Sequence, residues 1–333
     1  TYRGIRPPTD SFSDFALYVA FFPQLIAGPI TRWGFFGPQL ATQPHVGMTR
    51  IEASLFLLAV GYVKKVACAD SLGGFVDAVY ADIGEHGWIE LAVALYAYAF
   101  QIYFDFSGYT DIAMGVAGLF GFRLPENFRH PYLAENPSEF WRRWHISLST
   151  WLRDYLYVPL GGNRRGTART YVNLLITMLL GGLWHGAAWT FVIWGGFHGL
   201  WLAVHRATSG RDWWRPRGTG HAAAPRTPLW LRRAVTFHLI ALAWVPFRAA
   251  SLRDAGAFLL GLFSGRPLLH PLPVGPIVLV LIGFATHGLA TRVELGSWWR
   301  SVPRPVQGAV YGLVVVLIGL FSAQSGRFIY FQF

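Results

Sequence analysis

Long apolar stretches dominate the chain, and they predict a series of membrane-spanning helices. A bilayer core requires about 20 consecutive apolar residues in a helix. The candidate stretches are residues 12–30, 51–68, 88–104, 107–122, 171–205, 229–247, 274–289 and 306–321. Gly, Pro or polar residues interrupt several of them, which is typical of helices that are buried or line a cavity rather than face lipid.

The stretch 171–205 is too long for one crossing, because it would form roughly 50 Å of helix. Basic residues flank it on both sides: Arg164, Arg165 and Arg169 before it, and Arg206 and Arg211 after it. Positive charge is retained on the cytoplasmic side, so we expect a hairpin with both ends in the cytoplasm. Its break is expected near the string GGLWHG at 181–186, deep in the membrane.

Composition supports a membrane protein. Residues of the types AVILMFWYC make up 53% of the 333 residues, and charged residues only 14%, where roughly 25% is usual. This balance excludes a disordered chain and a soluble globule. We expect an all-α, polytopic integral membrane protein with one domain over 1–333 and a basic loop at 206–228. The chain opens on Thr1 without an initiator Met, so preceding helices are expected to be missing.

The net charge of +11 has two interpretations. In a soluble protein it would favour nucleic-acid binding, but here the cations lie in connections between apolar stretches. Membrane orientation is the simpler explanation, and we expect membrane lipid and no nucleic acid as a partner. The single Cys68 excludes an intramolecular disulfide and a cysteine metal cluster. No other cluster of metal ligands appears in the sequence, so no metal site is expected.

A segment between the apolar stretches, residues 140–155, has the pattern of one amphipathic helix that lies in the membrane interface or against the bundle. Its apolar stripe recurs at spacings of three and four residues. The stripe consists of Trp141, Trp144, His145, Leu148, Trp151, Leu152 and Tyr155. Pro137 is a plausible start signal, and the string PLGG at 159–162 a plausible stop.

His185 is the sharpest candidate for chemistry, because ionisable groups inside membrane segments are costly and often functional. It lies between Leu183-Trp184 and the apolar residues 187–189. A neutral His can act as a general base on a hydroxyl. The alternative is structural, since Gly182 and Gly186 form a small-xxx-small packing motif with His185 hydrogen-bonded inside.

Two further histidines lie in predicted membrane segments. His198 is thirteen residues from His185, which on a continuous helix is a rotation of about 220° to nearly the opposite face. A break at Gly195-Gly196 could bring the two together, but Gly195 and Gly199 favour packing. For His238, cavity lining and packing both remain open.

A polar patch separates two apolar stretches and consists of Tyr103, Asp105, Ser107, Tyr109 and Asp111. It has two interpretations: a carboxylate that orients a His or binds a polar substrate, or a helix break or partner for a buried Arg. Arg142 and Arg143 could bind an anionic donor through bidentate contacts, although snorkelling to the interface is common for such residues. Further binding candidates are Trp184 and Asp105.

Motifs of several enzyme classes are missing. No phosphate-binding G-x-x-x-x-G-K-[ST] loop, G-x-S-x-G elbow or H-E-x-x-H helix occurs in the sequence. An ATP-driven pump, a serine hydrolase and a zinc protease are therefore unsupported.

Four ordered strings resemble a known family. Residues 127–163, which begin NFRHPYLAENPSEFWRRWHISLSTWLRDYLYVPLGG, resemble the signature of the membrane-bound O-acyltransferases. Their form is most similar to the bacterial branch acting in alginate O-acetylation, whose relatives include the D-alanyl-lipoteichoic acid transfer protein. The strings GGLWHGAAWTF at 181–191, YFDFSGYTD at 103–111 and FPQLIAGPI at 22–30 match further signatures of that branch.

The resemblance implies a helical membrane fold and acyl transfer across the membrane. The family's buried catalytic His falls on His185, and an assisting His or Asn of the upstream motif falls on His145. His238 matches a His of some lipoteichoic-acid relatives. The implied donor is a cytoplasmic thioester, either acetyl-CoA or a carrier-bound acyl group, with no tightly bound cofactor. The implied acceptor is a hydroxyl of an exported polysaccharide such as alginate.

The resemblance also suggests periplasmic or extracellular acetyltransferase partner proteins and a location in the bacterial inner membrane. The alternative function is a non-enzymatic conduit, which passes an acyl group or lipid-linked sugar to a separate periplasmic transferase. A scaffold of an export complex is a second alternative, but it leaves the buried histidines without a purpose.

Overall fold

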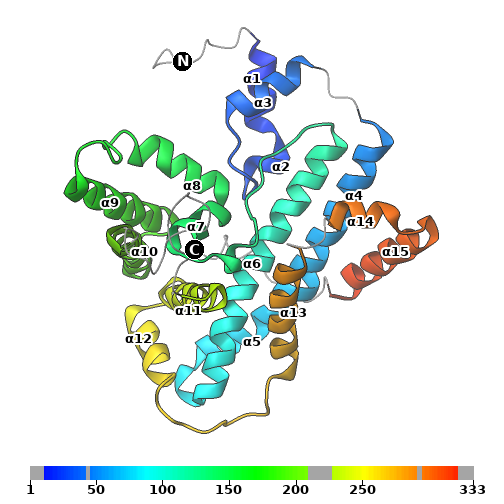
Figure 1. The fold of residues 1–333 in the computed structure, drawn as a ribbon. Coiled ribbons are helices and arrows are strands. Elements are labelled where there is room, and N and C mark those ends of the chain that lie inside the picture. The colour runs from blue at the N-terminus through cyan, green and yellow to red at the C-terminus, as the bar shows by residue number, and fades with distance from the viewer. Residues whose placement is uncertain (1–10, 43–45, 209–226, 291–294, 322–333) are drawn as a thin grey trace.

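Helices form all the regular structure in the described part of the chain, which confirms the all-α prediction. The computed structural model describes residues 11–42, 46–208, 227–290 and 295–321, and none of these lies in a strand (Figure 1). The helices are α1 (Phe12–Ala20), α2 (Phe22–Leu25), α3 (Trp33–Ala41), α4 (Met48–Tyr62), η1 (Val63–Ala69), α5 (Asp70–Ala81), η2 (Ile83–Glu85), α6 (Trp88–Leu119), η3 (Pro131–Leu133), α7 (Pro137–Arg143), α8 (Ile146–Leu152), η4 (Arg153–Tyr157), α9 (Thr167–His185), α10 (Trp189–Thr208), α11 (Leu229–Arg248), α12 (Leu252–Gly261), α13 (Val274–Ala290), α14 (Leu295–Ser301) and α15 (Arg304–Phe321).

Helix α6 runs through the middle of the fold, and α4, α5, α11 and α13 pack against it (Figure 1). Most of its side chains are buried. Within the described ranges, α6 is the one helix both long and apolar enough to cross a membrane. The long, buried α6 therefore serves as the frame on which the other helices are placed.

The prediction of two segments at 88–104 and 107–122 is wrong, because α6 continues through the polar patch. The Asp105 carboxylate lies 2.7 Å from Lys65 Nζ, and that of Asp111 lies 2.6 Å from Lys64 Nζ. Both lysines belong to η1, which continues α4 without a break. Since the buried charges are paired, the backbone has no need to leave the helix. The partners are lysines, not the arginine suggested by the sequence.

The prediction of one amphipathic helix over 140–155 is also wrong. Helix α7 begins at Pro137 as expected but ends at Arg143, and α8 begins at Ile146. At the break, the N–H of Arg129 donates to the carbonyl of Arg143 (3.0 Å), and the N–H of Ile146 donates to the carbonyl of Asn127 (3.0 Å). The neighbouring segment 127–129 thus replaces the lost helical hydrogen bonds. Trp151 and Tyr155 of the predicted apolar stripe are exposed.

The first predicted segment, 12–30, is not a single helix. Helix α1 ends at Ala20, Pro23 lies in the first turn of the short α2, and the chain then continues without helix to Arg32. Phe21 between the two helices is extended, and Pro23 is tolerated in the first turn of α2 because its missing N–H would have no helical partner there. Residues 26–32 therefore form an irregular, non-helical segment between α2 and α3.

The hairpin predicted within 171–205 is confirmed, with α9 ending at His185 and α10 beginning at Trp189. Its two helices touch through glycine: a Cβ on Gly195 would lie 2.3 Å from the carbonyl oxygen of Met178. A Cβ on Gly182 would lie 2.3 Å from the carbonyl oxygen of Phe191. This confirms the packing role of the small-xxx-small motifs.

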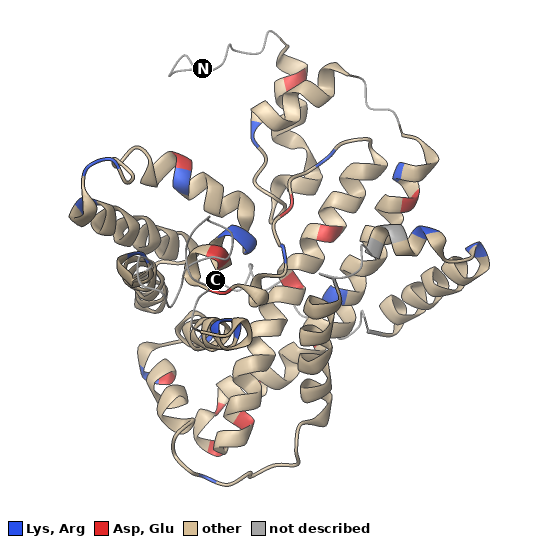
Figure 2. Cartoon of the chain, in the orientation of Figure 1, with Lys and Arg blue, Asp and Glu red and all other residues tan. Residues whose placement is uncertain are grey.

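The last predicted stretches form helices, at α11 for 229–247, α13 for 274–289 and α15 for 306–321. The basic loop predicted at 206–228 lies outside the described residues except at its two ends. Figure 2 shows that Lys and Arg lie mainly near helix ends and in connections, apart from the two lysines of η1.

Two neighbouring glycines give a matched test of the hairpin packing. Gly195→Ala forces a Cβ against the Met178 carbonyl, so we expect it to lower the free energy of unfolding by about 1–3 kcal/mol. Gly196→Ala is the control, because its Cβ would meet only the Leu179 side chain at 3.5 Å. Thermal unfolding of the detergent-purified variants measures the difference, and equal stability of the two variants would contradict this packing.

Candidate active site

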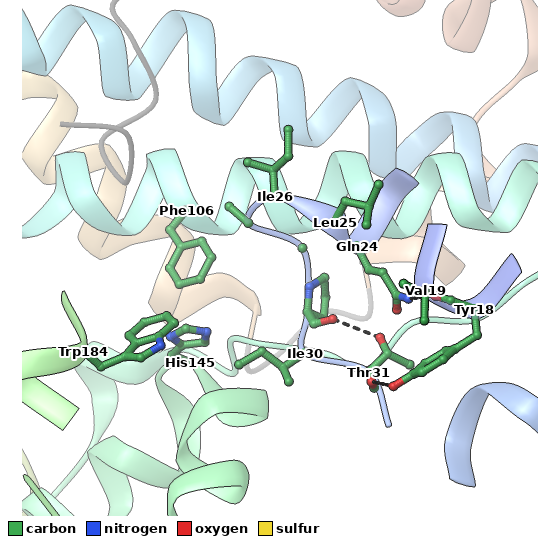
Figure 3. Close-up of a pocket in the computed structure, with 13 residues that line it drawn as sticks. Tyr18, Val19, Gln24, Leu25, Ile26, Ile30, Thr31, Phe106, His145 and Trp184 are labelled. Atoms are coloured by element: carbon green, nitrogen blue, oxygen red, sulfur yellow. Dashed lines mark hydrogen bonds between the residues drawn. The ribbon is translucent and has the colours of Figure 1, made fainter. Parts of the chain in front are cut away.

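A cavity of about 380 Å³ lies where the irregular segment after α2 meets α6, α9 and the break between α7 and α8 (Figure 3). His145 and Trp184 lie next to each other on its wall, with Phe106 nearby. The remaining lining residues come from the chain near α1 and α2. They are Tyr18, Val19, Gln24, Leu25, Ile26, Ala27, Gly28, Pro29, Ile30 and Thr31.

The backbone of His145 has the left-handed conformation, with φ of 42° and ψ of 55°. His tolerates this region better than most residues that carry a Cβ. Its side chain is buried, and its ring meets the Phe106 ring edge-on at 4.6 Å between centroids. The turn at the α7–α8 break therefore aims the imidazole at the cavity, which a continuous helix could not do.

Asn127 connects the segments around this turn. Its side-chain oxygen accepts hydrogen bonds from the backbone N–H (3.2 Å) and the hydroxyl (2.6 Å) of Ser147, and its amide donates to the Thr110 hydroxyl of α6 (3.4 Å). The Ser147 hydroxyl in turn accepts from the backbone N–H of Ile30 (3.0 Å). Asn127 is completely buried. Its amide links α6 to α8, and through Ser147 to residues 26–32 between α2 and α3, which we call the cavity segment.

A surface ion pair holds the far end of the cavity segment. Arg32 Nη1 lies 2.6 Å from a carboxylate oxygen of Asp154 in η4. The hydrogen bond from Arg153, assisted by Arg32, lowers the pKa of Asp154. The carboxylate therefore stays ionised at mildly acidic pH and the ion pair persists.

His185 also packs against Trp184. Its ring centroid is 5.0 Å from that of Trp184, 5.2 Å from that of Trp194 and 5.1 Å from that of Phe247. The centroids of the His145 and Trp184 rings are 6.3 Å apart. The structure thus groups the two predicted catalytic histidines around one indole.

The other two histidines lie elsewhere. His198 is fully buried in α10, where its ring contacts Trp141 at 5.1 Å and Trp194 at 4.9 Å between centroids. The rotation argument from a continuous helix does not apply to it, because the helix breaks before Trp189. His238 is exposed on α11, and its Nδ1 hydrogen-bonds the Ala234 carbonyl at 2.7 Å.

Arg142 and Arg143 line a second, larger cavity of about 860 Å³ beside α7. Three arginines of its wall are paired with glutamates: Arg129 with Glu126, Arg143 with Glu139 and Arg232 with Glu135. Arg142 is exposed, its Nε donates to the Ser138 carbonyl at 3.1 Å, and among the described residues no carboxylate pairs with it. Arg142 therefore carries the cationic charge that this cavity can offer to an anion.

The two remaining binding candidates from the sequence, Trp184 and Asp105, lie in different surroundings. Trp184 lines the first cavity, whereas the Asp105 carboxylate is engaged by Lys65. The string at 22–30 is recognisable in the sequence as a family motif, but nothing in it predicts that Gln24 and the following Thr31 line the first cavity. Gly28-Pro29 was the available signal for a non-helical segment there, since a Cβ on Gly28 would lie 2.4 Å from the Pro23 carbonyl oxygen.

Comparison with known proteins gives consistent results. The sequence profile of the membrane-bound O-acyltransferase family matches residues 8–211. A probable alginate O-acetylase AlgI of Pseudomonas putida is 40% identical over all of this chain, and one of Pseudomonas aeruginosa is 44% identical over 86% of it. A peptidoglycan O-acetyltransferase of Helicobacter pylori is 43% identical over 80% of the chain.

The chain spans 71%, 55% and 51% of the lengths of these three proteins, respectively. The profile match covers most of the chain and includes both His145 and His185. The first relative matches the chain from end to end. This chain therefore belongs to the membrane-bound O-acyltransferase family.

Proposed function

We propose that the chain is a membrane-embedded O-acyltransferase that moves an acetyl group from a thioester to a hydroxyl of an exported polysaccharide such as alginate. The observation that carries the proposal is that His145 and Trp184 line one cavity and that the ring of His185 lies against the ring of Trp184. The printed functions of the relatives, alginate O-acetylase and peptidoglycan O-acetyltransferase, support the same chemistry.

In this proposal His185 acts as the general base. It accepts the proton of the acceptor hydroxyl while that oxygen bonds to the thioester carbonyl carbon. The tetrahedral intermediate then collapses, the carbon–sulfur bond breaks, and the thiolate takes the proton back from the imidazolium. The aromatic rings of Trp184, Trp194 and Phe247 surround His185, which favours its neutral, basic form.

His145 is proposed to orient the donor or to stabilise the oxyanion of the intermediate through its ring N–H. Its left-handed turn, supported by the Asn127 network, fixes the ring on the cavity wall. Such preorganisation is what a transition-state donor needs, because the ring does not have to reorient during the reaction.

Arg142 is proposed to bind the donor. Acetyl-CoA and a carrier-bound thioester both present a pantetheine arm with phosphate, and an arginine without a carboxylate partner suits that group. No tightly bound cofactor is needed in either case. Partner acetyltransferases outside the membrane are part of the proposal, since an exported polymer must meet the acceptor side of the site.

A multi-pass location in the bacterial inner membrane completes the proposal. Helices α9, α10 and α11 have 19, 20 and 20 residues, or about 28–30 Å of helix, so in length, though not in mean hydropathy, they suit a bilayer core. The connection after α6 carries Arg123 and Arg129, whereas the one before it, residues 82–87, has no Lys or Arg. The positive-inside rule then places the Arg142 cavity on the cytoplasmic side.

Replacing His185 tests the catalytic role. We expect His185→Ala to lower acetyl transfer by roughly 10²–10⁴-fold, the usual contribution of a general base, while the protein still accumulates in the membrane. The measurement is release of free CoA by purified protein supplied with acetyl-CoA and a hydroxyl acceptor. His238→Ala, on the exposed face of α11, is the control.

Two outcomes would count against the enzyme. If His185→Ala releases CoA at the wild-type rate, another group is the base. If the wild-type protein releases no CoA with acetyl-CoA or a carrier-bound donor, the conduit alternative is favoured.

Two substitutions at His145 separate its backbone role from its imidazole. Gly adopts the left-handed conformation without strain, so we expect His145→Gly to keep the turn and yet lose turnover by roughly 10²-fold. His145→Ala adds backbone strain of about 1–2 kcal/mol and should be less stable as well. Wild-type turnover in His145→Gly would assign this residue to the turn alone.

Replacing Arg142 tests the donor site. Since a hydrogen bond to a charged group contributes about 1.5–3 kcal/mol, we expect Arg142→Ala to raise the KM for acetyl-CoA roughly 10-fold with kcat nearly unchanged. Arg253→Ala, an exposed arginine on α12 outside this cavity, is the control. An unchanged KM in Arg142→Ala would exclude this cavity as the phosphate site.

A further inference from the structure

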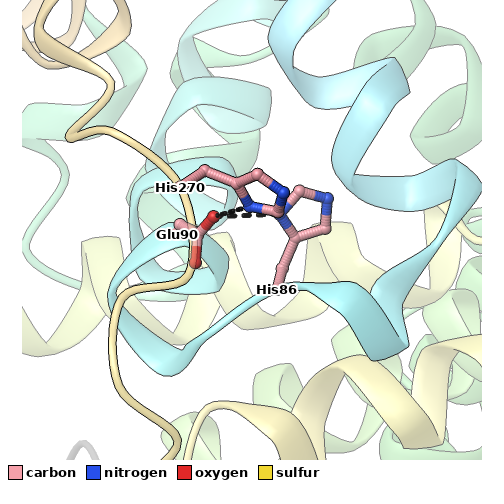
Figure 4. Close-up of side chains that lie close together, drawn as sticks. All are labelled: His86, Glu90 and His270. Atoms are coloured by element: carbon pink, nitrogen blue, oxygen red, sulfur yellow. Dashed lines mark hydrogen bonds and ion pairs between the residues drawn. The ribbon is translucent and has the colours of Figure 1, made fainter.

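His86, Glu90 and His270 form a cluster at the beginning of α6 (Figure 4). The Nδ1 atoms of His86 and His270 lie 3.1 Å and 2.6 Å from the same oxygen, Oε1 of Glu90. One ligand atom from each residue lies within 4.8 Å of the other two. Two imidazole nitrogens and a carboxylate oxygen thus converge on one small volume.

The cluster is separate from the proposed active site. Glu90 precedes Phe106, which lines the first cavity, by 16 positions along α6, or about 24 Å of helix. The sequence shows only His86 and Glu90 as neighbours, because His270 is 180 residues away from Glu90. The sequence predicts no cluster of metal ligands because His270 is remote from His86 and Glu90 along the chain, whereas the fold brings the three together.

The fold holds the loop with His270 firmly against α6. The backbone N–H of Leu269 donates to Glu90 Oε2 (3.2 Å), and the N–H of Gly87 donates to the same oxygen (2.8 Å). A Cβ on Gly87 would lie 1.9 Å from the carbonyl oxygen of Pro267, so only glycine permits this approach. The loop backbone, rather than chance rotation of a side chain, places His270 beside Glu90.

The donor set fits a divalent transition metal. Glu90 is 2% exposed, and its Oε2 is occupied by two backbone N–H groups, which leaves Oε1 to face the imidazoles. Two His nitrogens and one carboxylate oxygen are a ligand set that zinc accepts, with water in the fourth position. His270 is 53% exposed, so the ion and its water can enter from that side.

We propose that His86, Glu90 and His270 bind a zinc ion that fixes the connection between α12 and α13 to the beginning of α6. The ion replaces the protons that otherwise join the two Nδ1 atoms to Oε1. The backbone hydrogen bonds to Oε2 then act as the outer support that orients a metal-binding carboxylate.

The test measures metal binding directly and does not depend on acyl transfer. The full chain is purified in detergent with a tag that contains no histidine, stripped with EDTA and titrated with ZnCl₂ in a calorimeter. We expect one Zn²⁺ per chain, with binding that weakens below about pH 6, where free imidazoles gain protons. Co²⁺ is expected to give visible absorption bands typical of nitrogen and oxygen ligands in a four-coordinate site.

His270→Ala is the main variant, because its exposed side chain can be removed without taking hydrogen bonds from the loop backbone. We expect it to weaken Zn²⁺ binding at least about 100-fold, more than loss of a second-shell partner usually costs, and to abolish the Co²⁺ bands. His86→Ala should do the same, which guards against an effect of folding in either variant. The controls are His238→Ala and Glu85→Gln, the second at an exposed residue next to His86. Both should bind zinc like the wild type.

The proposal is overturned if the wild-type chain binds no zinc at micromolar concentrations, in which case the cluster is a hydrogen-bonded clamp. It is equally overturned if His270→Ala and His86→Ala bind zinc as tightly as the controls. Either result leaves the proposed acyltransferase function unaffected, because that is read from CoA release and from His185.

Discussion

The buried amide of Asn127 is the interaction on which the geometry of the proposed active site depends. The Asn127 side chain hydrogen-bonds α6 through Thr110 and α8 through Ser147, and the Ser147 hydroxyl extends this network to Ile30 of the cavity segment. In an apolar interior each of these polar groups would cost free energy if left unpaired. Because the buried Asn127 amide must be hydrogen-bonded, α6 and α8 are held at hydrogen-bonding distance from it.

The rule that buried polar groups find partners inside the protein also explains why α6 is continuous. Its two aspartates, Asp105 and Asp111, would interrupt an isolated apolar helix, but Lys65 and Lys64 pair with them. The lysines can approach because the helices touch at glycine: a Cβ on Gly61 would lie 2.7 Å from the Gly108 carbonyl oxygen. Close helix packing and charge pairing thus support each other at the same level of α6.

The sequence was sufficient where one short stretch determines the outcome. Hydrophobic length placed α11 and α13, and a stretch too long for one crossing, with glycines near its middle, predicted the α9–α10 hairpin. Family motifs indicated His185 and His145, and the structure groups the two. In each case the information lies within one helix or its ends.

Prediction failed where partners come from distant parts of the chain. The residues around the break at Trp144-His145 keep the apolar periodicity of a helix. The break is evident only from the backbone hydrogen bonds that Ile146 donates to Asn127 and that Arg129 donates to Arg143. The continuity of α6 depends on lysines from another helix, and His270 reaches Glu90 through a loop remote in sequence. Periodicity describes what a segment could form alone, whereas these features depend on what lies beside it.

The two histidines at Trp184 are positioned by different means, and this difference bears on their roles. His185 ends a helix whose place is set by glycine contacts with α10, so its position follows from rigid packing among aromatic rings. His145 lies in a left-handed turn whose flanking residues are hydrogen-bonded to two other segments, residues 127–129 and Ile30, and Ile30 lines the cavity. If the cavity binds substrate as proposed, that substrate would touch Ile30 and hence the network that orients His145. The packing of His185 does not depend on that network, so a fixed base and a substrate-responsive assistant are the roles that the two environments favour.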